Sequence, residues 1–146
     1  MNVYEFLTNS LIPIRLSCIN ALNWPITISI WYIYKDNKIF CATQKSAKIV
    51  EYLSKNARCG FEVASDNPPY KGVRGYGNAT LDEENGKEIL DLIIKKYLKD
   101  TNSSLAKFLK SRNETEIAIE IQPQNIFSYD YSNRMRDVVI KSNTQY

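Results

Sequence analysis

Apolar and polar residues alternate from Ile26 to Tyr34, and this period of two predicts a β-strand. One face of the strand would carry the isoleucines at positions 26, 28 and 30. The opposite face would carry Thr27, Ser29 and Trp31. The isoleucine row suits the interior of a sheet or barrel, whereas small polar groups beside one large ring make a poor core. The second row is therefore a candidate wall for a planar ligand, although Trp31 alone could equally be a core residue or lie between subunits.

A turn at Asp36-Asn37 separates this strand from a second one, Lys38 to Thr43, so the two are expected to form a hairpin. After a short loop, a helix is expected to run from Ala47 to Lys55.

The start of that helix is a candidate anion site. Ser46 is a favoured N-cap residue, and Lys48 lies in the first turn. Free N–H groups and the positive end of the helix dipole attract a phosphate there. Lys48 is accordingly the best single candidate for phosphate binding, and the alternative is an ordinary solvated lysine.

The rest of the chain alternates between strand and helix patterns. Further strands are expected at Ile14 to Asn20, Arg58 to Val63, Gly72 to Leu81, Thr115 to Ile121 and Ile126 to Tyr131. Further helices are expected within Met1 to Ser10, from about Gly86 to Lys99, and around Leu105 to Leu109. Six or seven strands with inserted helices predict one antiparallel barrel domain over residues 1–146, with peripheral helices.

Two strand patterns have specific consequences. From Thr115 to Ile121, isoleucines alternate with Glu116, Ala118 and Glu120, which predicts a strand buried on one side only. The strand from Gly72 also contains Gly75 and Gly77. Glycines inside a strand indicate either kinks at a barrel corner or a close approach by a cofactor or another subunit.

Composition narrows the chemistry. The 146 residues include no histidine, which excludes Ser-His-Asp and Cys-His nucleophiles and the common zinc sites, so no metal site is expected. Three cysteines at wide spacing, Cys18, Cys41 and Cys59, are either buried strand residues or redox groups. Any enzymatic chemistry would then depend on a bound cofactor.

The charge and hydropathy patterns bear on partners and location. The net charge of +3 is spread along the chain, which does not favour a nucleic-acid partner. No segment resembles a signal peptide or a membrane span, so the cytoplasm is the expected setting. The tail after Tyr131 is polar apart from Val138 to Ile140.

The hairpin, the Thr43-x-x-Ser46-x-Lys48 turn and the segment Asn56-Ala57-Arg58 resemble the pyridoxamine 5′-phosphate oxidase-like, FMN-binding split-barrel family. Two later stretches extend the likeness: Pro-Pro-Tyr-Lys-Gly-Val-Arg-Gly-Tyr-Gly at 68–77, and the closing strands at 119–123 and 126–131. The resemblance covers most of the chain from Ile14 to Tyr131. It implies a six- to seven-stranded antiparallel split β-barrel with peripheral helices.

The same resemblance implies a cofactor site. Members of the family are homodimers that hold FMN in a groove between two barrels. Matched by position, the strand that lines the flavin is Thr27, Ile28, Ser29 and Ile30. The turn that meets the ring edge and the phosphate is Thr43, Ser46 and Lys48. Gly72 and Val73 would approach the cofactor from the other subunit.

Three functions remain open at this stage. The first is an oxidoreductase that uses FMN or a deazaflavin to transfer hydride to or from a small substrate, with no catalytic residue assigned. The second is a flavin- or deazaflavin-binding carrier or stress-related protein without turnover. The third is a barrel that stacks single-stranded nucleic acid on its aromatics, which the scattered charge disfavours. The family's B6 oxidases have an arginine where this chain has Thr27, and the last segment of this chain lacks their tryptophan followed by arginine and histidine residues that bind the cofactor and substrate. Vitamin B6 oxidation is therefore not expected.

Overall fold

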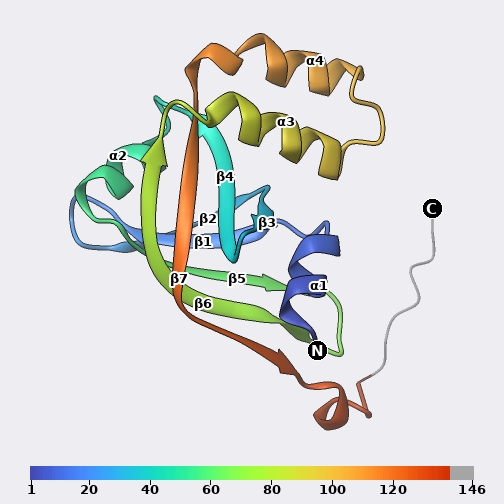
Figure 1. The fold of residues 1–146 in the computed structure, drawn as a ribbon. Helices are drawn as coiled ribbons and strands as arrows, with labels where there is room; N and C mark the ends of the chain where they lie inside the picture. The colour runs from blue at the N-terminus through green and yellow to red at the C-terminus, as the bar shows by residue number, and fades with distance from the viewer. Residues whose placement is uncertain (139–146) are drawn as a thin grey trace.

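Seven antiparallel strands form a single sheet within residues 1–138, the part of the chain that the computed structural model describes. The strands are β1 (Ile14–Ile19), β2 (Pro25–Ile30), β3 (Ile33–Lys35), β4 (Lys38–Gln44), β5 (Arg58–Ala64), β6 (Lys71–Asp82) and β7 (Glu116–Asp130). Their order across the sheet is β2-β1-β5-β6-β7-β4-β3 (Figure 1). The two edges, β2 and β3, do not pair with each other, so the barrel is split, as expected from the sequence.

Four helices surround the sheet: α1 (Val3–Asn9), α2 (Lys48–Lys55), α3 (Gly86–Tyr97) and α4 (Ser104–Ser111). In Figure 1, α3 and α4 lie together beside the ends of β4 and β7, and α2 lies apart from them. Helix α1 lies near the C-terminal end of α3, where Lys96 Nζ donates to the Leu7 carbonyl oxygen at 3.2 Å. The main core lies inside the curved sheet, where alternate residues of each strand point inward. Helix α2 adds Ile49, Val50 and Leu53 to this core, and α1 adds Leu7. None of the helices within residues 1–138 is long and apolar enough to cross a membrane.

The single strand expected from Ile26 to Tyr34 is instead two strands at opposite edges of the sheet. β2 ends at Ile30 after pairing with β1, and β3 begins at Ile33 and pairs with β4. The intervening Tyr32 is fully buried, and its hydroxyl donates a hydrogen bond to the Leu7 carbonyl oxygen at 2.8 Å. The hairpin prediction therefore holds only for its tip, from β3 to β4. There Asp36 and Asn37 both have the positive φ angles of a tight hairpin turn, 53° and 59°.

The two strands expected at Thr115 to Ile121 and Ile126 to Tyr131 are one strand, β7, of 15 residues. Pro123 does not end it because the register with β6 shifts at this point, where Gly77 pairs with Pro123 and Tyr76 pairs with Asn125. The shift leaves Gln124 as an extra residue. Proline, which has no N–H to donate, is tolerated at such a bulge.

The first part of β7 is buried on both faces, so the prediction of a one-sided strand was wrong. Ile117, Ile119 and Ile121 face the main core or its edge, as expected. Ala118, on the opposite face, packs against Ile89 and Ile93 of α3 in a second cluster. The residue pattern of the strand does not indicate that a helix covers its outer face.

Two of the β6 glycines allow β7 to come close. A methyl group added at Gly75 would lie 2.1 Å from the carbonyl oxygen of Asn125, and one added at Gly77 would lie 2.1 Å from that of Gln122. Contact with a neighbouring backbone therefore explains these two positions. Of the apolar tail segment, Val139 and Ile140 lie outside the described residues.

Candidate functional site

A cavity of about 550 Å³ lies between the sheet and the two helices α3 and α4. We call it the helix-side cavity. The end of β2 and the residue after it provide Ser29, Ile30 and Trp31, and β4 provides Ala42, Thr43 and Gln44. The helices provide Leu90, Ile93, Leu105 and Leu109. Pro13 and Glu116 complete the lining, which is mainly apolar.

Three of the predicted site residues, Ser29, Ile30 and Thr43, line this one cavity. They come from β2, at one edge of the sheet, and from β4, which lies next to the other edge, and the fold brings both strands to the same opening. Trp31 stands beside them, with its ring stacked on that of Tyr97 at 4.7 Å between centroids and 5° between planes. An aromatic pair and two hydroxyl-bearing residues therefore border the same space.

The predicted site residues of β2 point to alternate faces of the sheet. Thr27 is exposed on the outer face, where its hydroxyl lies 2.9 Å from that of Ser17. Ser29 accepts a hydrogen bond from the Arg15 guanidinium at 3.0 Å. Ile28 is half-buried and packs against the main core. The expected division of β2 into an apolar inner row and a polar outer row is therefore confirmed.

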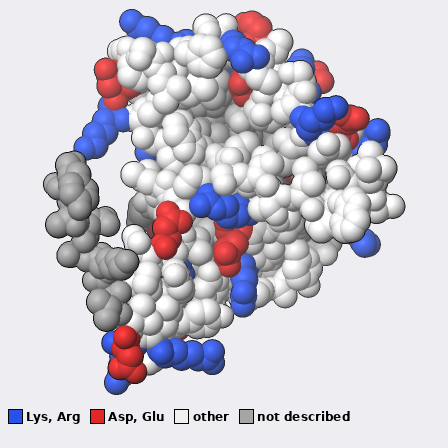
Figure 2. All heavy atoms as spheres, turned by 180° about the vertical axis from the view of Figure 1, so that it is seen from behind, with Lys and Arg blue, Asp and Glu red and all other residues white. Residues whose placement is uncertain are grey.

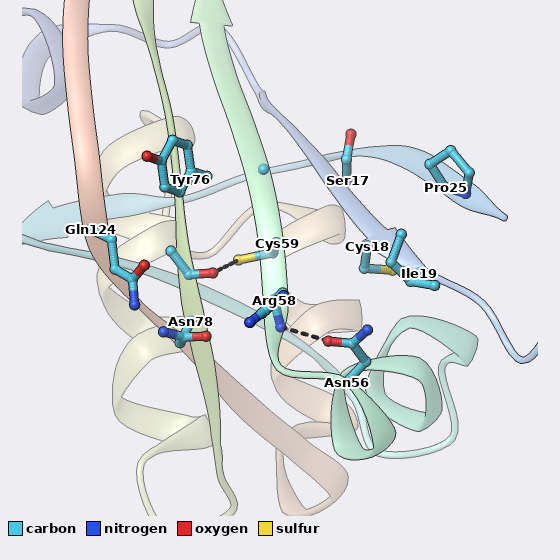
Figure 3. A pocket seen from close by; sticks show the side chains of 12 residues that line it. Ser17, Cys18, Ile19, Pro25, Asn56, Arg58, Cys59, Tyr76, Asn78 and Gln124 are labelled. Carbon is cyan, nitrogen blue, oxygen red and sulfur yellow. Dashed lines mark hydrogen bonds between the residues drawn. The ribbon is translucent and has the colours of Figure 1, made fainter. Parts of the chain in front are cut away.

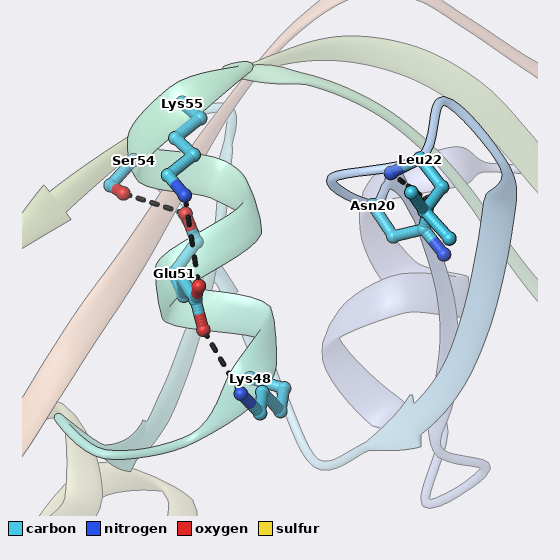
Figure 4. Close-up of polar contacts among 6 residues, drawn as sticks. All are labelled: Asn20, Leu22, Lys48, Glu51, Ser54 and Lys55. Atoms are coloured by element: carbon cyan, nitrogen blue, oxygen red, sulfur yellow. Dashed lines mark hydrogen bonds and ion pairs between the residues drawn. The ribbon is translucent and has the colours of Figure 1, made fainter.

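The start of α2 differs from the prediction by one residue. The helix begins at Lys48, the N-cap is Ala47, and no side chain caps the first turn, so Ser46 is not the cap. The side chain of Lys48 is 77% exposed and its Nζ lies 3.2 Å from the carboxylate of Glu51. Lys55 reaches the same carboxylate from the other end of the helix at 3.7 Å (Figure 4). Neither Ser46 nor Lys48 lines the helix-side cavity.

Gly72 and Val73 lie near the start of β6, and neither lines the helix-side cavity. Val73 is fully buried in the main core. A methyl group added at Gly72 would lie 2.5 Å from the Val63 carbonyl oxygen, so packing against β5 requires glycine here. Any contact of these two residues with a ligand of a second copy would be made by their backbone.

Glu116 is a candidate site residue that the sequence interpretation placed on a solvated face. It lines the helix-side cavity but is only 6% exposed. Gln44 Nε2 donates a hydrogen bond to Glu116 Oε1 at 2.6 Å, whereas Oε2 is buried with no partner among residues 1–138. Burial raises the pKa of this carboxyl, and the Gln44 bond and the charge of Arg112 oppose the rise. The alternation of Glu116 with core-facing isoleucines did not indicate this burial, because the helices that cover Glu116 are α3 and α4.

A second cavity, of about 620 Å³, opens on the outer face of the strands (Figure 3), and we call it the strand-face cavity. Polar side chains from β1, β5, β6 and β7 surround it, among them Ser17, Arg58, Asn78 and Gln124, with the ring of Tyr76. None of the nine predicted cofactor residues lines it. Arg58, which belongs to the Asn56-Ala57-Arg58 segment, does.

The cysteines are buried on β1, β4 and β5 and form no disulfide. Burial raises the pKa of Cys59 to about 11 and also raises the pKa values of Cys18 and Cys41. Raised thiol pKa values disfavour the reactive thiolate, which supports the interpretation of buried strand residues. Within residues 1–138, no group of three or more acidic, cysteine or histidine side chains could hold a metal ion.

On the face that Figure 2 shows, neither the acidic nor the basic side chains form a patch of one charge sign. Acidic and basic groups alternate around a broad area that has neither. This dispersal does not favour binding of a nucleic-acid backbone on that face, which would need a basic patch.

The chain was compared with known proteins by sequence and by structure. No protein-family profile matches it, and no curated protein matches it by sequence. By structure, it resembles a conserved hypothetical protein from Mycobacterium tuberculosis, with a TM-score of 0.77 and 18% identity over 99% of this chain and 93% of that one.

Two further solved structures are similar over most of their length. One is an F420 reductase, with a TM-score of 0.69 and 12% identity over 87% of this chain and 98% of that one. The other is a candidate pyridoxamine 5′-phosphate oxidase from Listeria innocua, with a TM-score of 0.61 and 17% identity over 80% of this chain and 86% of that one. The chain therefore has the fold of the pyridoxamine 5′-phosphate oxidase-like split-barrel proteins, as its sequence predicted.

Proposed function

We propose that this chain binds a flavin-type cofactor, FMN or a deazaflavin, and uses it as an oxidoreductase on a small substrate. The observation that carries the proposal is that Ser29, Ile30 and Thr43, matched to the cofactor site from sequence, line one cavity in a split barrel. The F420 reductase and the candidate pyridoxamine 5′-phosphate oxidase of the same fold support a flavin-type ligand.

The residues at this cavity suit the ring of such a cofactor. The hydroxyls of Ser29 and Thr43 supply hydrogen bonds at its edge, and Trp31, held flat by Tyr97, supplies a planar contact. The apolar side chains of α3 and α4 exclude water from the same space. A bound flavin supplies the ring position that accepts or gives hydride, and the protein orients it.

The start of α2 suits the phosphate of the cofactor. Because no side chain caps the first turn of α2, the N–H groups of Lys48 and Ile49 are available to an anion, whereas that of Val50 donates to the Ala47 carbonyl oxygen at 3.0 Å. Lys48 adds a positive charge at the same end, although Glu51 must release its ammonium group first. Phosphate binding would then rest on one lysine and the helix backbone.

A second copy of the chain would complete the site. The outer face of β6 and β7 exposes two aromatic side chains, Tyr76 at 53% and Phe127 at 43%. Arg74 stacks between the rings of Phe127 and Tyr129, at 5.1 and 4.9 Å from their centroids. An exposed aromatic surface of this kind supports pairing of two barrels through these strands. That pairing would bring the backbone of Gly72 and Val73 to the partner's cofactor.

Paired lysine variants test the phosphate site. Lys48→Ala and Lys55→Ala each remove one ion pair to Glu51, but only Lys48 lies at the start of α2. We expect Lys48→Ala to weaken FMN binding about tenfold and Lys55→Ala to leave it unchanged. Riboflavin has no phosphate, so neither variant should change its affinity. Cofactor titration followed by visible absorbance and fluorescence measures all of these.

Several outcomes would refute the proposal. Purified dimer that binds neither FMN nor a deazaflavin at micromolar concentration would rule out a flavin site. Equal losses of FMN affinity in the two lysine variants would show that the phosphate does not bind at the start of α2. Binding without reduction by NAD(P)H or reoxidation by any acceptor would leave a carrier or stress-related role in place of an enzyme.

A further inference from the structure

Glu116 is the one ionisable side chain among the residues that line the helix-side cavity. Its Oε1 is occupied by Gln44, which is itself held by two further contacts. Gln44 Nε2 also donates to the Arg112 carbonyl oxygen at 3.0 Å, and Gln44 Oε1 accepts from the Thr115 hydroxyl. Glu116 Oε2 has no partner in the part of the chain that the structure describes. Buried polar groups are nearly always paired, and the described residues leave this enclosed oxygen free for a group that enters the cavity once the carboxyl turns toward it.

The rest of the lining determines what that group belongs to. The helices present only leucine and isoleucine to the cavity, and the ring of Trp31 adds to this apolar surface. The strands add Ile30 and Ala42 together with the uncharged polar residues Ser29, Thr43 and Gln44. An anionic ligand would lose its hydration there and find no positive charge among the lining side chains. The broad torsion about the last bond of a glutamate side chain allows Oε2 to turn toward such a ligand.

We propose that the helix-side cavity binds an uncharged, mainly apolar molecule, and that Glu116 donates a hydrogen bond from Oε2 to an acceptor atom of that molecule. Only the identification of this molecule as the substrate of the enzyme rests on the proposed function. Binding itself requires no cofactor.

The protonated form of Glu116 is the form that can donate this bond, so binding depends on pH. Burial favours that form by raising the pKa of the carboxyl. The groups that face it from β4 and from α3 are Gln44 and apolar side chains, which do not titrate. At the end of α4, Arg112 carries a fixed positive charge that opposes the rise. The ligand should therefore bind at low pH and be released as the carboxyl ionises.

Prodan, a neutral naphthalene dye with one ketone, is the probe, and its emission reports both burial and hydrogen bonding. The full chain should bind it at about pH 5 and lose at least about tenfold in affinity by about pH 9. Glu116→Gln keeps an oxygen for Gln44 and an N–H donor for the ketone, so its affinity should not change with pH. Glu116→Leu should bind at least about tenfold more weakly at low pH.

A second pair of variants locates the dye. Leu109→Trp should fill the cavity and block Prodan, whereas Phe108→Trp, an exposed position on the same helix, should not. Circular dichroism establishes that each variant is folded. The anionic dye 1-anilinonaphthalene-8-sulfonate should bind much more weakly than Prodan, because its sulfonate cannot enter an apolar cavity.

The inference is overturned if Glu116→Gln keeps the pH dependence of the wild type. It is also overturned if Leu109→Trp leaves Prodan affinity unchanged, or if the anionic dye binds as tightly as Prodan. Because these titrations contain no flavin, their result is independent of the FMN titrations. Failure of FMN to bind would leave the cavity intact, and failure of Prodan would leave the flavin proposal intact.

Discussion

Replacing Tyr32 with phenylalanine tests whether this side chain fixes α1 to the split of the barrel. The ring is fully buried, and its hydroxyl donates to the Leu7 carbonyl oxygen at 2.8 Å. Tyr32→Phe removes that bond but keeps the ring, over which the Lys96 ammonium lies at 3.8 Å from the centroid. The Leu7 carbonyl also retains a donor, since Lys96 Nζ lies 3.2 Å from it.

The size of the effect follows from these contacts. Because the carbonyl keeps one partner, the loss is that of one ordinary buried hydrogen bond, about 1 kcal/mol. For a chain of 146 residues, this loss corresponds to a fall in Tm of about 3 °C. Tyr32→Leu also removes the cation–π contact and part of the packing, so its cost should be about 3 kcal/mol.

Urea denaturation followed by circular dichroism measures both free energies of unfolding. Tyr4→Phe is the matched control, because it makes the same chemical change on an exposed ring of α1 and should cost nothing measurable. The reasoning fails if Tyr32→Phe equals this control, or if it costs as much as Tyr32→Leu.

Two further predictions concern Lys96 and the β6 glycines. Burial lowers the pKa of Lys96 to about 8, below its ordinary 10.5, so the folded protein binds fewer protons than the unfolded chain between these values. The stability of the wild type relative to Lys96→Met should therefore rise as the pH increases from about 7.5 to about 9.5, and a flat or falling difference in urea denaturation would contradict this. Gly75→Ala should cost about 3 kcal/mol or prevent folding, because its methyl group would lie 2.1 Å from the Asn125 carbonyl oxygen. Gly60→Ala, whose methyl group would have no neighbour nearer than 3.9 Å, should cost less than about 1 kcal/mol. Similar urea denaturation midpoints for the two variants would argue against close packing of β6 on β7.

Local patterns predicted those parts of the fold that depend on neighbouring residues. The alternation in β2 indicated which residues face the core, and Asp36-Asn37 indicated the turn, because strand geometry and positive φ angles are properties of short segments. The pattern could not show that the chain leaves one sheet edge at Ile30 and joins the other at Ile33. That change depends on where α1 and α3 provide partners for Tyr32.

The same limit explains the two errors in β7. Pro123 ends a strand by local rules, yet the bulge opposite Gly77 accommodates it, and a bulge is defined by two strands together. Glu116 alternates with isoleucines and so was expected to face solvent. The helices that bury it begin 30 residues earlier and 12 residues earlier in the chain, at Gly86 and Ser104, and only the tertiary fold brings them over β7.

The location of the helix-side cavity follows from the split itself. A closed barrel would pair β2 with β3 and fill the space between them with hydrogen-bonded backbone. Here the sheet ends at β2 on one side and at β3 on the other, and the chain crosses between these edges through Trp31 and Tyr32. Ser29 and Thr43 border the opening from its two sides, and α3 and α4 cover it without filling it. A cavity formed by an unpaired seam needs no catalytic sequence motif, and for this reason its one buried carboxyl was visible only in the structure.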